Sequence, residues 1–234
     1  PPPPPPPPPL LCYRRQRQMC IRDRVLGAEE LPKGAPDYSA VINKALAAKA
    51  DVFVTNMFGG DAVACIKTAY DMGLHKTSML VNAWTTYEVA MGIPPEAAAQ
   101  LHALTYYYWD LEKFSPELAT RSEALNKDHM KKYGYPADAY AVLAYTASDV
   151  LLKAIEQAGS VDGAKVGKVL ATAKFDTVKG VSWFREDHQL EGEYLAFFVK
   201  GKKASEKKSK YDVFEVLGAY GGPSALPKLS DLGY

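Results

Sequence analysis

The chain has 234 residues, 47% of them hydrophobic and 24% charged, which is typical of a globular protein large enough to bury a core. Its formal charge of +1 comes from the N-terminal end. Without the five arginines and one aspartate of residues 1–24, 23 basic and 26 acidic residues remain, a net charge of −3. This balance excludes a strongly basic surface for nucleic acid or anionic membrane over the body of the chain.

Residues 1–24 are not expected to belong to the fold. Nine consecutive prolines favour a polyproline II rod, and the stretch after them, LCYRRQRQMCIRDR, has neither helical nor strand periodicity. One interpretation is an SH3-type ligand followed by a basic patch. We favour a non-native leader, because the stretch is similar to translated sequencing adapter. Its Cys12 and Cys20 lack the spacing of zinc ligands, and we expect the native N-terminus, with any signal peptide, to lie outside this sequence.

From Val25 onward, strand and helix periodicities alternate. The expected elements are a weak strand at 25–31, a helix at 37–50 with Asp37 as N-cap, a strand at 51–57, a helix from Gly60 to Gly73, a strand at 77–84, a short helix at 85–92 and a strand at 99–109. Cys65 falls on the apolar face of the helix that follows Gly60. Four strands separated by helices predict an open, doubly wound parallel sheet.

The pattern changes after residue 110. Three helices are expected in succession, at 115–134 with Ser115 as N-cap, at 137–159, and at 162–173 with Asp162 as N-cap. Short antiparallel strands are expected after them, at 180–185, 193–203 and 210–218. The second helix carries a wide apolar stripe, formed by Tyr140, Leu143, Ala147, Val150, Leu151, Ala154 and Ile155. Helices without strands between them need a sheet to cover, so we predict an α/β protein whose first half is missing.

From Val25 to about Lys203, the chain resembles the substrate-binding proteins of bacterial ABC transporters of the branched-chain amino acid (Leu/Ile/Val-binding) type. The blocks that carry the resemblance are DYSAVINKALAAKADVFVTNMFGGDAVACIKTAYDMGL, YYYWD, KKYGYPADAYAVLAYTASDVLLKAIEQAG and FDTVKGVSWFREDHQLEGEYLAFFVKGK. The resemblance implies the type I periplasmic-binding fold, in which two Rossmann-like α/β lobes close over a ligand. Most of the first lobe would then be missing, so the chain is expected to be N-terminally truncated.

The resemblance also implies how the chain is divided. After the leader in 1–24, it implies the second α/β lobe in 25–108, helices that pack on the missing first lobe in 109–185, and returning strands with a C-terminal tail in 186–234. The implied function is to bind a branched-chain or other hydrophobic amino acid, or a related small amide or acid, and to deliver it to an ABC permease in the membrane. The implied location is the periplasm, or a lipid-anchored position outside the cytoplasm.

Two other functions remain as alternatives. One is a ligand-sensing module of the same fold in a receptor or regulator, which a fused DNA-binding, transmembrane or kinase segment would favour. The less favoured one is a flavodoxin-like enzyme, which would need a titratable pair at the strand ends. No cofactor and no nucleic acid partner is expected. No metal ion is expected either, since His102, His129 and His188 are too scattered for a metal site.

Candidate ligand-binding residues follow the expected strands. The Gly59-Gly60-Asp61 turn lacks the third glycine of a dinucleotide-binding loop and the Lys-Ser/Thr of a Walker A loop. We expect a helix start there, with Phe58 and the glycine backbone at one lip of a cleft and Asp61 facing a cationic group. Asn82 and Trp84 end the next strand, at the same edge of the sheet. The expected ligand-binding residues are Phe58, Gly59, Gly60, Asp61, Asn82, Trp84 and Tyr106.

Simpler interpretations compete with several of these assignments. Trp84 would serve equally well as a core or turn aromatic residue. Strand alternation sends Tyr106 and Tyr108 to one face and Tyr107 and Trp109 to the other, and most of these rings are expected to pack in the core or the hinge. The lysine-rich run 200–210 predicts a solvated turn, with a docking surface for a permease as the alternative.

Overall fold

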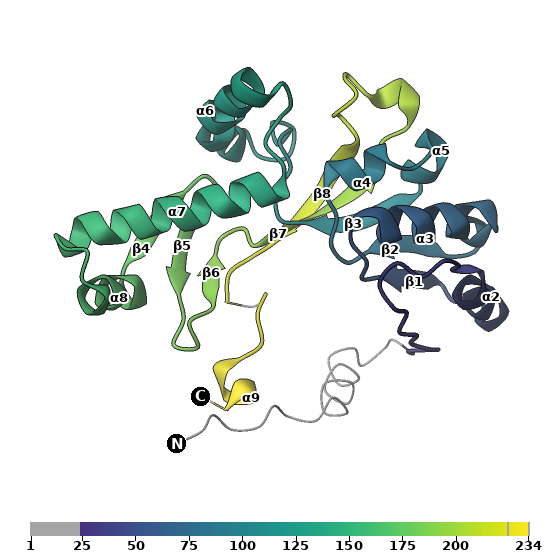
Figure 1. The fold of residues 1–234 in the computed structure, drawn as a ribbon, viewed down its shortest axis with the longest axis horizontal. Coiled ribbons are helices and arrows are strands. Elements are labelled where there is room, and N and C mark those ends of the chain that lie inside the picture. The colour runs from purple at the N-terminus through teal and green to yellow at the C-terminus, as the bar shows by residue number, and fades with distance from the viewer. Residues whose placement is uncertain (1–23, 224, 234) are drawn as a thin grey trace.

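The computed structural model describes residues 24–223 and 225–233. The expected leader, with Cys12 and Cys20, therefore lies outside the described residues, apart from Arg24 at its end. Figure 1 shows two parts joined near the middle of the molecule. One is built on a five-stranded sheet and the other on a three-stranded sheet.

The five-stranded sheet has the strand order β1-β2-β3-β7-β8. Its strands are β1 (Val52–Thr55), β2 (Met79–Asn82), β3 (Leu101–Thr105), β7 (Ala196–Gly201) and β8 (Phe214–Tyr220). The first three run parallel, while β7 and β8 join them in antiparallel order. The expected α/β fold class is confirmed, and the strands expected near 51–57, 77–84 and 99–109 are present.

The weak strand expected at 25–31 is wrong. That segment pairs with no strand among the described residues, and Val25 and Leu26 are 66% and 47% exposed. A glycine and two glutamates follow them, so the segment offers too little apolar surface to repay the ordering of an extra strand. The sheet consequently has three parallel strands, not four.

Helices α2 (Ser39–Ala48), α3 (Gly59–Asp71), α4 (Tyr87–Met91) and α5 (Pro95–Ala98) accompany this sheet (Figure 1). Between α3 and β2 the chain forms the short helix η1 (Leu74–Lys76). Cys65 lies on the buried side of α3, as expected, in a cluster with Ile42 of α2. The N-cap of α2 is Tyr38 and not Asp37. Asp37 instead accepts a hydrogen bond from Ser39 N at 2.9 Å, as Asx turns do just before a helix.

The second part holds α6 (Pro116–Tyr133), α7 (Ala139–Ala158), α8 (Gly163–Thr172) and a three-stranded antiparallel sheet. Its strands are β4 (Lys174–Thr177), β5 (Gly180–Phe184) and β6 (Leu190–Gly192). Ser115 and Asp162 cap α6 and α8 as expected, each accepting a backbone hydrogen bond from the first turn. The remaining short helices are η2 (Ala204–Glu206), between β7 and β8, and α9 (Leu229–Leu232) near the C-terminus.

The apolar stripe of α7 is only partly buried. Val150 and Ala154 are buried with Val166 of α8 and Phe175 of β4. The other half of the stripe is exposed: Tyr140 by 51%, Leu143 by 42% and Leu151 by 47%. Among the described residues, α8 and β4 cover one side of the helix only. That a further sheet covers the other side stays a prediction.

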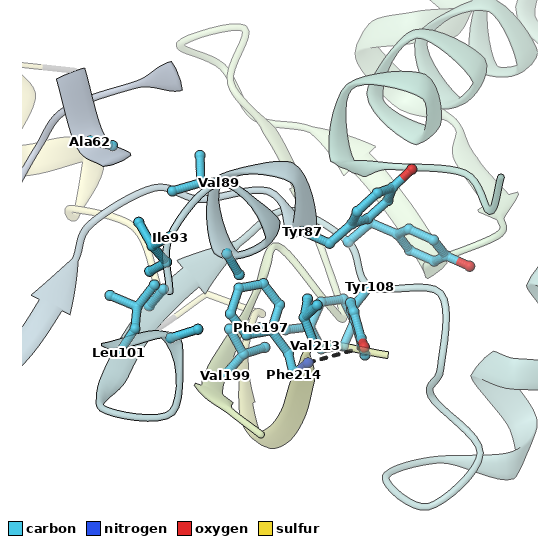
Figure 2. Packing of buried hydrophobic residues seen from close by; sticks show 14 of the residues in the cluster. Ala62, Tyr87, Val89, Ile93, Leu101, Tyr108, Phe197, Val199, Val213 and Phe214 are labelled. Atoms are coloured by element: carbon cyan, nitrogen blue, oxygen red, sulfur yellow. Dashed lines mark hydrogen bonds between the residues drawn. The ribbon is translucent and has the colours of Figure 1, made fainter. Parts of the chain in front are cut away.

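A buried aromatic cluster joins the sheet to the segment that leaves it. Figure 2 shows Tyr87, Tyr108, Phe197 and Phe214 packed together, with the hydroxyl of Tyr108 accepting a hydrogen bond from Phe214 N at 3.1 Å. The alternation expected for the tyrosines is wrong, because β3 ends at Thr105. Beyond the strand, the neighbouring Tyr107 and Tyr108 are both 2% exposed.

Three segments connect the two parts, and we call them the connecting segments: 106–111 after β3, 192–195 from the last residue of β6 to β7, and 220–223 from the last residue of β8 onward. The second and third are hydrogen-bonded to each other. Leu195 N donates to Tyr220 O at 2.7 Å, and Gly222 N donates to Gly192 O at 2.7 Å. The chain therefore passes between its two sheets at one narrow place.

Gly221 allows this close approach. A Cβ at this position would stand 1.8 Å from Glu193 O, a backbone atom that cannot move aside without shifting the segment. We expect Gly221→Ala to lower the free energy of unfolding by about 1–3 kcal/mol. The matched control is Gly218→Ala on β8, where a Cβ meets nothing within 4 Å. Urea denaturation of both variants checks this, and equal stabilities would contradict it.

Candidate functional site

The parallel strands β1, β2 and β3 end at Thr55, Asn82 and Thr105, on one edge of the sheet that we call the carboxyl edge. In open α/β sheets, ligands bind beyond this edge. Three of the expected aromatic residues follow these strand ends. The structure brings two of them together, because the rings of Trp84 and Tyr106 lie 6.2 Å apart between centroids, at 36°.

Phe58 and Gly59 form the turn between β1 and α3. Phe58 is the N-cap of the helix, in extended conformation, and its side chain is 54% exposed. Gly59 has a φ of +53°, in the left-handed region that favours glycine. A Cβ at Gly59 or Gly60 would meet nothing within 4 Å, so the backbone here is open to an approaching molecule.

The carboxylate of Asp61 is hydrogen-bonded to other residues of the protein. Its Oδ2 accepts a hydrogen bond from Gly34 N at 3.0 Å and its Oδ1 accepts one from Tyr38 Oη at 3.1 Å. Burial raises the pKa of Tyr38, and the hydrogen bond and charge of Asp61 raise it further. The carboxylate thus ties the loop before α2 to the first turn of α3. This gives Asp61 a structural role that needs no ligand.

Asn82 is fully buried at the end of β2. Its Oδ1 accepts a hydrogen bond from Thr55 Oγ1 at 3.0 Å, while its Nδ2 has no hydrogen-bond partner among the described residues. A buried amide with an unpaired donor costs free energy, which is unusual in a structural position. The side chain therefore lies beneath the carboxyl edge, in contact with the end of β1 rather than with the surface.

Lys179, in the turn between β4 and β5, was not among the expected site residues. It is 3% exposed, and its Nζ lies 3.2 Å from the centroid of the Tyr106 ring. Sequence gives almost no signal for this arrangement, because a lysine in a Val-Lys-Gly turn is typical of an exposed loop. Its burial depends on Tyr106 and Phe197, which lie far from it along the chain.

A separate hollow of about 650 Å³ lies on the second part of the molecule, between the β5–β6 hairpin and the C-terminal residues. Its lining includes Trp183, Arg185, Glu191 and Pro227. Glu191 is 4% exposed and accepts a hydrogen bond from Trp183 Nε1 at 3.1 Å. None of the expected ligand-binding residues lines this hollow, so its size alone does not make it the candidate site.

Within residues 24–223 and 225–233, no group of three or more histidine, cysteine, aspartate or glutamate side chains is arranged to hold a metal ion. Among the same residues, no helix combines the length and the apolar character needed to cross a membrane. The buried thiol of Cys65 has its pKa raised to about 11 by burial, so it stays protonated near neutral pH.

The structure thus combines a five-stranded α/β sheet with a second part built on a three-stranded antiparallel sheet, joined by the connecting segments. A sequence profile of the periplasmic binding protein family matches residues 22–206. The chain therefore belongs to the periplasmic binding protein family. A search of curated proteins found no match.

Several solved structures of similar fold are named as ABC transporter substrate- or ligand-binding proteins. An amino acid ABC transporter substrate-binding protein from Pseudomonas fluorescens is 22% identical with a TM-score of 0.81, and the match covers 96% of this chain and 58% of that one. A branched-chain amino acid ABC transporter periplasmic ligand-binding protein from Burkholderia xenovorans is 23% identical with a TM-score of 0.80, with coverages of 95% and 57%. A branched-chain amino acid transporter substrate-binding protein from Streptococcus pneumoniae, solved with isoleucine, is 18% identical with a TM-score of 0.66, with coverages of 87% and 55%.

The chain thus spans little more than half the length of these solved proteins. The family and these neighbours are binding proteins by name. The resemblance found in the sequence is confirmed at the level of family and fold. The roles of individual residues at the carboxyl edge stay predictions.

Proposed function

We propose that this protein is the substrate-binding component of an ABC importer and that it binds a branched-chain or other hydrophobic amino acid, or a related small amide or acid. The observation that carries the proposal is the family match together with the aromatic residues that follow the parallel strands. Phe58, Trp84 and Tyr106 offer an apolar wall at the carboxyl edge, which is the kind of surface that small-molecule clefts use.

In this proposal, the residues at the carboxyl edge have different roles. Phe58 and Trp84 contact the apolar side chain of the ligand, and Tyr106 supports Trp84 from the first connecting segment. Gly59 and Gly60 leave the main chain accessible, so polar groups of the ligand reach backbone N–H groups at the start of α3. Asp61 and Asn82 hold this frame through Tyr38 and Thr55 and contribute less to the ligand itself.

Binding in this proposal is a conformational event with no catalytic step. The two parts move about the connecting segments, close over the ligand, and present the closed form to a permease in the membrane. The protein would work outside the cytoplasm, in the periplasm or anchored there by a lipid. The names of the solved neighbours, one of them holding isoleucine, support this class of ligand.

The proposal is tested by thermal stabilisation with free L-amino acids. L-leucine, L-isoleucine or L-valine at millimolar concentration is expected to raise the melting temperature, since a ligand that binds only the folded state stabilises it. Phe58→Ala and Trp84→Ala are expected to abolish this rise and to keep the fold, because both side chains are at least partly exposed.

Two matched variants show whether the loss is local. Tyr133 is 51% exposed on α6, close to the 54% of Phe58, and Trp183 is half-buried like Trp84 but lies on β5. Tyr133→Ala and Trp183→Ala are expected to keep the ligand-induced rise. An unchanged rise in Phe58→Ala and Trp84→Ala would remove both residues from the binding site.

A further inference from the structure

Lys179 sits in a fixed turn. Thr177 Oγ1 accepts a hydrogen bond from Lys179 N at 3.1 Å and donates one to Gly180 O at 2.8 Å. Gly180 has a φ of +88°, which glycine adopts without strain, and a Cβ there would stand 2.3 Å from Glu193 Oε2. Val181, which follows this turn, exchanges hydrogen bonds with Glu193 of the second connecting segment, its N donating to Oε2 at 3.0 Å and its O accepting from Glu193 N at 3.1 Å.

The side chain of Lys179 contacts two connecting segments at once. Its Nζ donates to Leu195 O at 2.8 Å and lies 3.2 Å from the ring centroid of Tyr106. The ring centroid of Phe197, at the start of β7, lies 5.7 Å from the same Nζ atom. Leu195 belongs to the second segment and Tyr106 to the first, so a single amine bridges them.

The third connecting segment is attached through the same residue. Leu195 accepts from Lys179 with its carbonyl and donates to Tyr220 O with its N–H, at 2.7 Å. The Lys179 amine therefore contacts the first and second segments directly, and it is linked to the third through Leu195, by two successive hydrogen bonds. No other lysine among the described residues is as deeply buried as this one, at 3% exposure.

Compensation for a charge on Lys179 comes from the Tyr106 ring and the Leu195 carbonyl, without a carboxylate partner. It forms no salt bridge with another described residue. The titratable groups near it are Tyr106 on the first segment and Glu193 and Tyr194 on the second. Glu193 Oε2 accepts from Val181 N, and Tyr194 stacks on Phe197. Burial lowers the pKa of Lys179 well below its usual value and raises the pKa of Tyr106.

We propose that Lys179 is the positioning residue of the hinge: by holding the connecting segments together at one point, its amine fixes the angle between the two parts of the protein. The inference rests on the hinge closure proposed above, but it does not depend on which ligand is bound. It assigns the control of that motion to a residue outside the carboxyl edge.

A dependence on pH follows from the geometry. The neutral amine fits this site, donating to Leu195 O against the ring of Tyr106. Protonation places a charge without a carboxylate partner in this buried site, where the Tyr106 ring offsets only part of the desolvation cost, and the turn is expected to loosen. The hinge is therefore expected to be held firmly at alkaline pH and to loosen as the pH falls through the folded-state pKa of Lys179.

The test measures the distance between the two parts by electron spin resonance. Spin labels go on Lys67→Cys of α3 and Gln157→Cys of α7, both exposed, in a chain whose own three cysteines are replaced. The unsubstituted Lys179 protein is expected to give one narrow distance distribution at alkaline pH and a broader one on acidification. Lys179→Met is expected to lose the narrow peak at every pH.

Two further variants sharpen the result. Lys179→Gln keeps a donor for Leu195 O without a charge, so it is expected to give a narrow peak that does not change with pH. Lys174→Met is the matched control, because Lys174 also lies over an aromatic ring, Trp183 at 5.3 Å, but it is exposed, at the start of β4 and away from the connecting segments. It is expected to behave like the parent.

Narrow, parent-like distributions in Lys179→Met would overturn the proposal. If Lys179→Met and Lys179→Gln do not fold, the pH series on the parent protein decides alone: broadening on acidification supports the proposal, and a constant width overturns it. None of these measurements contains an amino acid ligand. A failure of the ligand assay and a failure of the hinge assignment are therefore distinguishable.

Discussion

Asp212→Ala is expected to lower the free energy of unfolding by about 3–5 kcal/mol, the range for breaking a buried ion pair by removing one partner. Asp212 is 0% exposed, and its Oδ1 lies 2.5 Å from Nζ of Lys202, whose side chain is 13% exposed. Its Oδ2 accepts a hydrogen bond from Lys208 N at 2.9 Å. Removing the carboxylate leaves a nearly buried ammonium, with Asp110 at 4.0 Å as the remaining partner.

The pair also predicts a dependence on pH. Burial raises the pKa of Asp212, but the hydrogen bonds from Lys202 and Lys208 outweigh it, so the pKa is lowered overall. A carboxylate whose pKa is lowered in the folded state stabilises the folded protein at pH values above its unfolded-state pKa of about 3.9. That contribution is lost as the pH falls from there through the folded pKa.

Urea denaturation of Asp212→Ala and of the parent, at neutral pH and in this acidic range, checks both statements. The stability difference is expected to shrink in acid, where the parent loses the same interaction. The control is Asp71→Ala, which removes an exposed pair with Lys67 on α3 and should cost no more than about 0.5 kcal/mol. Equal losses in the two variants would contradict the buried-pair account.

Phe197→Ala is expected to cost about 3–5 kcal/mol, the range for emptying the place of a fully buried phenylalanine. Its ring is 0% exposed and packs edge-to-face on Phe114 at 5.9 Å and parallel to Tyr194 at 6.1 Å. The residue lies at the start of β7, where the second connecting segment enters the sheet, so its loss weakens the core at the joint (Figure 2).

Chemical denaturation with the ligand-site variant Phe58→Ala as control measures this effect. Phe58 is 54% exposed, so its truncation is expected to change stability by less than about 0.5 kcal/mol. A loss below about 1.5 kcal/mol in Phe197→Ala would show that the joint repacks around the missing ring and is not a rigid core.

Features set by nearby residues were predictable from the sequence. Ser115 and Asp162 cap their helices, and Gly73 and Gly134 end α3 and α6 with positive φ, because these conformations depend only on the chain's own neighbours. The positions of the parallel strands were predictable for a similar reason, since short apolar runs between helices favour strands, but their full burial was not, because Val52 and Val54 of β1 are 48% and 59% exposed. The sequence could not show that 25–31 fails to form a strand, because a strand needs a neighbouring strand to pair with, and its own residues do not specify one.

In the candidate site too, features set by nearby residues were predictable and contacts between distant residues were not. Phe58, Trp84 and Tyr106 follow their strands as the pattern predicts, and the parallel order brings their strand ends to one edge. The engagement of Asp61 by Gly34 and Tyr38 was not predictable, since it requires the loop before α2 to fold over α3. The burial of Lys179 was equally hidden, because three segments distant in sequence must meet around it.

The most direct measurement of the central claim follows the tryptophan indole N–H signals by NMR during titration with L-leucine. The chain has three tryptophans. Trp183 donates its indole N–H to Glu191 at 3.1 Å, away from the connecting segments, and serves as the internal reference. The account predicts a saturable shift of the Trp84 signal, while the Trp183 signal stays in place. An unmoved Trp84 signal with leucine, isoleucine and valine at millimolar concentration would contradict it.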